Sequence, residues 1–398
     1  MPLPAFSLLT RTALCAGLSA AAACQLYPPV ATGDEVDYGR ALPAGADALL
    51  PLGPGESFPN VTGSWTRRDE ILPVLDRSLR FTRSRHAGQF FPIEGVSQER
   101  AIQSLERMGL LLENATSALD FQQRVEAEFE AYKSAGWDGR GGGVLFTGYC
   151  TPLLPGSLQP TGRYRFPLHG LPPDLVKGSD GTTLGQETAS GLRPYPTRRE
   201  ILIDPAYQAL EIVWLEDPVD AFIAHVNGSA FVELESGEVA RFGYAGKNGR
   251  PYTSLGKELI AAGEVPAAEM SLAAIRSWAA RTSPARVESF LDRNQSYVFF
   301  TPIEGNPRGS LNLPVTRERS LATDKTLFPR GAIVYVDTEL PTLGGGTVPF
   351  EQMMFDQDTG GAIRTAGRAD IYLGVGHEAE ELSGATQAEG QMYYLFLR

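Results

Sequence analysis

The chain is poor in the residues that bind metals and form covalent cross-links. Only four of its 398 residues are histidine and three are cysteine, and none of them has metal-ligand spacing. This scarcity argues against a zinc or redox-metal centre, and no cofactor is predicted. Basic residues are also few, because 35 Lys and Arg stand against 47 Asp and Glu, with no Lys/Arg-rich run. That balance argues against nucleic acid as the main partner.

The N-terminal apolar run is too short to cross a bilayer. Residues 12–23 are mostly apolar, and the region before Cys24 contains Arg11 but no acid, which is typical of a secretion signal. The run ends in A-A-A-C, similar to the lipobox of bacterial lipoproteins. We therefore expect a signal over residues 1–23 and an acylated Cys24, with simple cleavage nearby as the alternative. Cys15 would leave with the signal, so Cys150 would be the last thiol and no intramolecular disulfide is expected.

At 398 residues the chain is long enough for two domains, and its composition is that of an ordinary globular protein. Residues 24–60 are rich in Pro, Gly and Ala and predict a flexible tether. Apolar residues at helical spacing predict helices over residues 67–81, 96–115, 119–134, 271–280 and 284–292. From residue 144 onward alternating patterns predict strands, including a hairpin over residues 231–244. Asp217 and Asp220, on either side of Pro218, are predicted to cap a turn or helix.

One stretch near the C-terminus, residues 356–376, has the features of a site: D-Q-D-T-G-G-A-I-R-T-A-G-R-A-D-I-Y-L-G-V-G. The two glycines after Asp358 allow a tight turn that comes close to a ligand or another strand. Asp370 alternates with apolar residues in a strand-like pattern. An acid in such a pattern is paired, solvated at a sheet edge, or a catalytic proton donor, and the pattern alone leaves these three open.

Several segments, in order, resemble the membrane-bound lytic murein transglycosylase A family. The stretch over residues 356–376 is similar to the signature of the three-aspartate (3D) domain, D-x-G-G-A-I followed by D-I-Y, and Asp324 would complete the set of three. Residues 144–152, V-L-F-T-G-Y-C-T-P, and residues 243–256, G-Y-A-G-K-N-G-R-P-Y-T-S-L-G, resemble two further family segments. The resemblance covers roughly residues 144–376.

This resemblance implies a mainly β fold with N-terminal helices. A double-psi β-barrel catalytic domain would consist of residues 61–150 and 303–398, with the 3D region at residues 303–376. A second, family-specific β domain would be inserted at residues 151–302. The glycan-binding groove would lie between the two domains.

The resemblance also implies site residues. Asp370 would be the catalytic acid, with Asp358 and Asp324 as the other members of the signature. A glycine flanked by a hydroxyl and an aromatic ring would let a sugar lie close to the backbone, and amides, hydroxyls and aromatic faces suit flat, polar sugars. The candidate substrate-binding residues are Thr147, Gly148, Tyr149, Tyr244, Asn248, Tyr252 and Ser254.

The implied activity is that of a carbon–oxygen lyase acting on peptidoglycan glycan strands. Protonated Asp370 would donate its proton to the oxygen between MurNAc and GlcNAc and then act as base for the 6-hydroxyl of the same MurNAc, giving 1,6-anhydro-MurNAc. The protein would be a monomeric lipoprotein on the periplasmic side of the bacterial outer membrane. Two alternatives stay open: a hydrolase that uses Asp370 with Asp358, and a non-catalytic sugar-binding protein.

Overall fold

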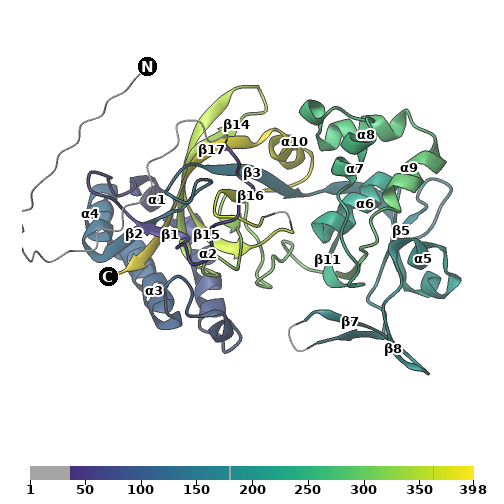
Figure 1. The fold of residues 1–398 in the computed structure, drawn as a ribbon, viewed down its shortest axis with the longest axis horizontal. Helices are drawn as coiled ribbons and strands as arrows, with labels where there is room; N and C mark the ends of the chain where they lie inside the picture. The colour runs from purple at the N-terminus through teal and green to yellow at the C-terminus, as the bar shows by residue number, and fades with distance from the viewer. Residues whose placement is uncertain (1–35, 179–180, 362) are drawn as a thin grey trace, which may run out of the picture. The chain divides into compact units, whose positions relative to one another are not determined.

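The computed structural model describes residues 36–178, 181–361 and 363–398, so the predicted signal and Cys24 lie outside the described residues. Its largest sheet has eight strands in the order β1-β2-β17-β14-β15-β13-β16-β3, and β17 also pairs with β3. That additional pairing closes six of the strands, from β3 through β16, β13, β15 and β14 to β17, into a barrel (Figure 1). The strands are β1 (Leu49–Pro51), β2 (Phe129–Ser134), β3 (Val144–Thr151), β13 (Ser320–Ala322), β14 (Ile333–Pro341), β15 (Thr347–Asp358), β16 (Arg368–Val375) and β17 (Gln387–Leu397). The predicted mainly β fold with a barrel is confirmed.

Strand β14 shows how the sequence pattern builds two cores at once. Val334 and Val336 belong to the core that also contains residues of β3 and β16. Ile333 and Tyr335 alternate with them and belong to a second core, made with the N-terminal helices. Because successive side chains of a strand point to opposite faces, an uninterrupted apolar run is what a strand buried on both faces needs.

The N-terminal helices α1 (Thr62–Thr66), α2 (Arg68–Thr82), α3 (Gln98–Asn114) and α4 (Ala118–Glu128) supply the other half of this second core. They confirm the helices predicted over residues 67–81 and 96–115. Ser97 caps α3, since its hydroxyl accepts a hydrogen bond from the Arg100 backbone N–H at 3.1 Å. Leu105, Met108 and Leu112 lie one to two turns apart on α3 and are fully buried.

The third predicted helix is too long. The sequence predicted a helix over residues 119–134, but α4 ends at Glu128 and β2 takes Phe129–Ser134. Phe129 and Ala131 are buried while Glu130 is only partly buried, which is a period of two, and β2 pairs with both β17 and β1. The same apolar positions fit a helical period equally well, so pairing with distant strands decided the outcome.

Part of the predicted flexible tether over residues 24–60 lies in the described residues, and it contains a short strand. Leu49–Pro51 form β1, and Ala48 is fully buried. The Glu94 carboxylate accepts hydrogen bonds from the backbone N–H groups of Ala48, at 2.7 Å, and Leu49, at 3.3 Å. A short apolar segment thus extends the sheet beyond the barrel despite the Pro- and Gly-rich surroundings.

A second sheet of six strands lies within the segment between β3 and β13, in the order β12-β11-β10-β4-β9-β5. The predicted hairpin over residues 231–244 is confirmed as β10 and β11, which are antiparallel. The strands are β4 (Leu153–Ser157), β5 (Phe166–His169), β9 (Glu211–Leu215), β10 (Ser229–Leu234), β11 (Val239–Lys247) and β12 (Val298–Pro302).

Further helices lie around the second sheet, and α10 packs on β3 of the barrel. The helices predicted over residues 271–280 and 284–292 are confirmed as α8 (Leu272–Ala280) and α9 (Pro284–Leu291). Asp217 caps α6 as predicted, accepting a hydrogen bond from the Val219 backbone N–H at 2.7 Å. The remaining elements are α5 (Arg198–Ile203), α6 (Pro218–Asn227), α7 (Leu255–Ala261), α10 (His377–Ala385) and a small sheet of β6 (Leu175–Lys177), β7 (Thr183–Thr188) and β8 (Gly191–Arg193).

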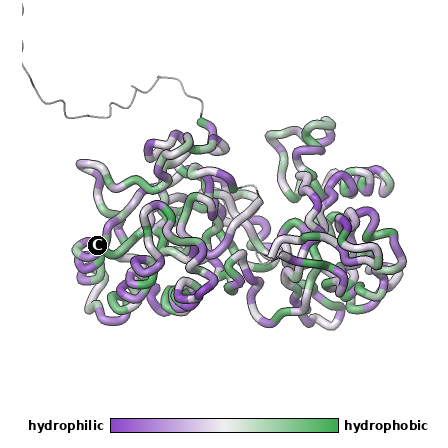
Figure 2. Tube along the Cα trace, turned by 60° about the horizontal axis from the view of Figure 1, so that its bottom comes forward, coloured by the Kyte–Doolittle hydropathy of each residue, from purple (hydrophilic) through white to green (hydrophobic). Residues whose placement is uncertain are grey.

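Among the residues that the structure describes, hydrophobic residues occur in short stretches rather than in one long segment (Figure 2). Within the described ranges no helix combines the length and the hydropathy needed to span a membrane. The apolar residues are instead used in the separate cores of the barrel and of the second sheet.

A buried ion pair holds the barrel near β13. The Lys325 ammonium donates to the carboxylate of Asp356 on β15, and both side chains are almost fully buried. Thr323 and Tyr394 donate further hydrogen bonds to Asp356 Oδ2, each at 2.8 Å. Burial raises the pKa of Asp356 and lowers that of Lys325, so each charge depends on the other being present.

Replacing Lys325 with methionine should therefore cost about 3–5 kcal/mol of unfolding free energy at neutral pH, because a buried carboxylate is left without its counter-ion. The double change Lys325→Met with Asp356→Asn should recover much of this loss. Acid should also reduce the loss, since a carboxyl whose folded-state pKa is raised destabilises the fold when ionised and stops doing so once protonated. Urea unfolding across pH measures both effects. Equal losses in the single and double variants would contradict the ion-pair account.

Candidate active site

Asp370 lies on β16, which pairs in parallel with β3. The register places Asp370 opposite Thr147 and Tyr372 opposite Tyr149. The Thr147 hydroxyl donates a hydrogen bond of 2.5 Å to Asp370 Oδ1. The strand pairing thus brings two residues predicted from separate motifs into direct contact.

Arg368 is a member of the site that the sequence motifs did not single out. Its Nε lies 3.4 Å from Asp370 Oδ1, and its Nη2 lies 3.4 Å from the Thr147 hydroxyl. Since it precedes Asp370 by two residues on a strand, the alternation of side chains places both on the same face. The two-residue spacing from Asp370 is the sequence feature that could have identified Arg368.

The second carboxylate oxygen of Asp370 is left for another partner. The side chain is 17% exposed, and no described residue donates a hydrogen bond to Oδ2. A Cβ atom on Gly360 would lie 4.0 Å from Oδ2, so the turn after β15 passes next to this oxygen. One oxygen of Asp370 is therefore held by the protein and the other is not.

Asp358, at the end of β15, is held by both oxygens. Its Oδ1 accepts hydrogen bonds from the backbone N–H groups of Ser310 and Thr359, each at 2.8 Å. Its Oδ2 accepts a hydrogen bond of 2.9 Å from the Tyr149 hydroxyl. Burial raises the pKa of Asp358 against the effect of these donors, and burial followed by the charge of Asp358 raises the pKa of Tyr149. Asp358 thus fixes Tyr149 and the loop at Ser310.

Thr147 and Tyr149 face the two acids, and Gly148 faces the other way. A Cβ atom on Gly148 would lie 2.6 Å from Leu373 Cδ1 and 2.7 Å from the Cα of Ser383 on α10. The expectation that Gly148 lets a sugar approach the backbone does not fit this packing. The glycine is needed because α10 packs directly on β3.

Asp324 shapes a turn and does not join the other two acids. It is 3% exposed, and its Oδ1 accepts hydrogen bonds from the Thr326 backbone N–H at 2.9 Å and hydroxyl at 2.7 Å. Within the described ranges no hydrogen bond connects it to Asp358 or Asp370. Its geometry supports a structural role in the segment after β13.

The other four candidates lie on β11 or between β11 and α7, and two of them are exposed. The side chains of Tyr244 and Tyr252 are 49% and 54% exposed, so their rings are accessible to solvent or to a sugar. Ser254 is the N-cap of α7 and accepts a hydrogen bond from the Lys257 backbone N–H at 3.4 Å. Among the described residues no cluster of His, Cys, Asp or Glu could hold a metal ion.

Asn248 is buried, which argues against the predicted sugar contact. Its side-chain amide donates to the carbonyl oxygens of Pro196, at 2.9 Å, and Gln295, at 2.8 Å. Its carbonyl oxygen accepts from the backbone N–H groups of Tyr297, at 2.9 Å, and Arg250, at 3.2 Å. Asn248 therefore joins three stretches of main chain.

Replacing Asn248 with alanine should lower the unfolding free energy by about 1–3 kcal/mol or more, because buried backbone groups lose their partners. Thermal or urea unfolding measures the loss. Tyr252→Ala is the matched control, since it removes an exposed side chain and should change stability by about 0.5 kcal/mol or less. An Asn248→Ala protein of native stability that binds glycan more weakly would restore the original prediction.

Two family models match separate regions of this chain. The family described as "MltA specific insert domain" matches residues 145–301, and the "3D domain" family matches residues 319–396. The membrane-bound lytic murein transglycosylase A of Vibrio cholerae is 33% identical over 263 residues, which are 64% of this chain and 66% of that protein. The Escherichia coli K12 protein of the same name is 32% identical over 270 residues, 67% of this chain and 69% of that protein. The matches thus span about two thirds of the length of these relatives.

Solved structures agree over more of the chain. A membrane-bound lytic murein transglycosylase from Agrobacterium tumefaciens superimposes with a TM-score of 0.71 at 26% identity, covering 88% of this chain and 98% of that one. E. coli MltA with bound chitohexaose gives a TM-score of 0.65 at 25% identity, covering 91% and 97%. The predicted family resemblance is confirmed. Because the E. coli relative exceeds 30% identity over more than two thirds of its length, the chain belongs to the membrane-bound lytic murein transglycosylase A family.

Proposed function

We propose that this protein is a peptidoglycan lytic transglycosylase in which Asp370 acts first as general acid and then as general base. The names of its relatives support the activity. The observation that carries the assignment to Asp370 is its asymmetric environment, with Oδ1 held by Thr147 and Arg368 and Oδ2 without a partner among the described residues. Asp358 has no comparable free oxygen.

In the first step, protonated Asp370 donates its proton to the oxygen that joins MurNAc C1 to GlcNAc. The C1–O bond breaks, the GlcNAc leaves as an alcohol, and positive charge develops on the MurNAc ring. Asp370 becomes a carboxylate at the same moment. The Thr147 hydroxyl at 2.5 Å and the Arg368 guanidinium at 3.4 Å stabilise that new negative charge.

In the second step, the carboxylate accepts the proton of the 6-hydroxyl of the same MurNAc while that oxygen bonds to C1. The product is 1,6-anhydro-MurNAc, Asp370 is protonated again, and no water is consumed. The internal hydroxyl competes well with water because its effective concentration at C1 is high once the ring is held in place.

A hydrolase with two acids needs a second carboxylate that is free to activate water or attack the sugar. Asp358 accepts three hydrogen bonds from the protein, which occupy both of its oxygens. Its role in the proposed mechanism is therefore to position Tyr149 and the turn that passes Asp370.

Further proposals concern the substrate and the domains. The E. coli relative has a solved structure with bound chitohexaose, and β-linked amino sugars of this kind suit the exposed rings of Tyr244 and Tyr252. We infer a groove between a catalytic domain, residues 61–150 and 303–398, and an inserted domain, residues 151–302. The parallel pairings β3–β16 and β13–β15 within the six-stranded barrel support a double-psi connectivity.

The central test compares two conservative changes. Asp370→Asn preserves the shape of the side chain but removes its proton chemistry, so turnover of purified sacculi should fall at least about 100- to 10,000-fold, near or below detection. Binding of chito-oligosaccharide should persist, because the amide is uncharged like the protonated acid. Asp358→Asn should lose less activity. Substantial anhydro-muropeptide formation by Asp370→Asn would overturn the assignment and make Asp358 the next candidate.

The anchoring proposal has its own test. We propose a monomeric lipoprotein on the periplasmic side of the outer membrane. The A-A-A-C run supports the lipid anchor, and the name of the relatives supports a location in the envelope. Cys24→Ala should move the protein to the soluble periplasmic fraction while the purified enzyme keeps its activity, since acyl chains on one cysteine suffice for stable anchoring. Fractionation and intact mass measure this. A wild-type protein that is soluble and unacylated would contradict it.

A further inference from the structure

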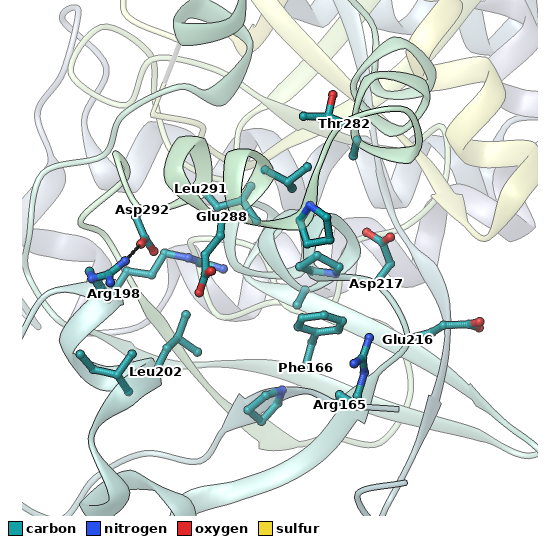
Figure 3. Close-up of a pocket in the computed structure, with 18 residues that line it drawn as sticks. Arg165, Phe166, Arg198, Leu202, Glu216, Asp217, Thr282, Glu288, Leu291 and Asp292 are labelled. Atoms are coloured by element: carbon teal, nitrogen blue, oxygen red, sulfur yellow. Dashed lines mark hydrogen bonds and ion pairs between the residues drawn. The ribbon is translucent and has the colours of Figure 1, made fainter. Parts of the chain in front are cut away.

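A cavity of about 370 Å³ lies beside the second sheet, far in sequence from Asp370 and built from other elements (Figure 3). Its walls come from β5, α5, α6 and α9, and they are largely apolar. Phe166, Leu202, Val287 and Leu291 are among the lining residues. The volume falls at the small end of the range of ligand pockets.

Arg198, at the start of α5, contributes to this wall a buried charge that has no ion pair among the described residues. It is 3% exposed, and its Nε and Nη1 have no hydrogen-bond partner among the described residues. Its guanidinium lies 4.9 Å from the ring centre of Phe222 and 5.6 Å from that of Tyr297, which stabilises the cation only in part. Burial lowers the pKa of Arg198 to about 10, so the group is still charged at neutral pH.

The acids Asp292, Glu216 and Asp217 that line the cavity form ion pairs or hydrogen bonds with other groups. Asp292 pairs with Arg199, the exposed neighbour of Arg198. Glu216 pairs with Arg163 at 2.8 Å, and Asp217 caps α6. The charge of Asp292 favours the charged form of Arg198 through space, but among the described residues no acid forms a hydrogen bond or an ion pair with Arg198. A buried charge without such a partner is costly.

One further acid lies at the exposed edge of the cavity. Glu288 on α9 is exposed, lines the same cavity, and has no ion-pair partner among the described residues. Figure 3 draws Arg198, Leu202 and Glu288 among the lining side chains. The cavity thus combines a buried cation, apolar walls and an acid at its exposed edge.

We propose that this cavity binds a short peptide through its C-terminal carboxylate, which pairs with Arg198. Arg165 also lines the cavity without an ion pair among the described residues, but it is exposed, whereas Arg198 is buried. One buried positive charge calls for one negative charge, so a carboxylate fits better than a phosphate dianion. Apolar side chains of the peptide lie against Phe166 and Leu202, and a backbone amide or ammonium group lies toward Glu288. This identification rests on the proposed function in one respect: murein glycan carries short peptides with free carboxylates, which would bring this ligand to the protein.

The test uses the full chain and isothermal titration with N-acetyl-D-alanyl-D-alanine. The same dipeptide with a C-terminal amide in place of the carboxylate, sodium acetate and inorganic phosphate serve as comparison probes. We expect the free acid to bind at least about tenfold more tightly than the amide, acetate or phosphate. Equal binding of acid and amide, or better binding of acetate or phosphate, would overturn the proposal.

Three variants locate the binding. Arg198→Met should weaken the dipeptide at least about tenfold while retaining the fold, because it removes an unpaired buried charge. Leu202→Glu changes a residue that is 40% exposed and should weaken binding similarly by repelling the carboxylate, which keeps the test valid if Arg198→Met is unstable. Arg241→Met is the matched control, since Arg241 stacks on Phe231 away from the lining residues and should bind normally. Unchanged binding in Leu202→Glu, or in a folded Arg198→Met, would contradict the assigned site.

The probe contains no glycosidic bond, so its binding does not depend on turnover. A protein that cleaves sacculi but does not bind the dipeptide would overturn only the peptide site. A protein that binds the dipeptide at Arg198 but leaves sacculi intact would overturn only the proposed function.

Discussion

The parallel pairing of β16 with β3 is the contact on which the candidate active site depends. It joins residues 223 positions apart in the chain and sets Thr147 against Asp370. A shift of one residue would place Gly148, which has no hydroxyl, opposite the acid and would turn Tyr149 away from Asp358. The second pairing of β3, with β17, closes the barrel and resists such a shift.

Three acids close together in sequence have three different hydrogen-bonding environments in this barrel. Asp356 is fully buried and compensated by Lys325, Thr323 and Tyr394. Asp358 is held by two backbone N–H groups and one phenol. Asp370 keeps one oxygen free of donors from the described residues. In the proposed mechanism, the hydrogen bonds around these acids, and not their residue type, distinguish Asp370 from the other two, since all three side chains are the same.

Much of this arrangement could be predicted from short-range pattern. The Asp217 cap, the β10–β11 hairpin and the strand carrying Asp370 follow from local spacing, and the motif resemblance indicated the barrel. Phe129–Ser134 could not be assigned, because its apolar positions fit both a helical and a strand period, and its partners lie far along the chain.

The direction in which side chains point was the second feature that could not be predicted from the sequence. A polar turn residue such as Asn248 has the same appearance in sequence whether it faces a sugar or distant main chain, and its four backbone partners favour the main-chain role. Gly148 was likewise interpreted as room for a ligand, whereas α10 fills that room. The missing partner of Arg198 is visible only in three dimensions, because it is an absence among described residues from several elements.

In the proposed mechanism the 6-hydroxyl of the same MurNAc, and not water, attacks C1 after the glycosidic bond breaks. Digesting purified sacculi in ¹⁸O-labelled water and weighing the released muropeptides tests this most directly. The single-acid mechanism predicts chain ends one water lighter than hydrolysed ends and free of ¹⁸O, because Asp370 transfers only a proton. Reducing ends that carry one ¹⁸O atom would show that water is the nucleophile and would contradict that mechanism.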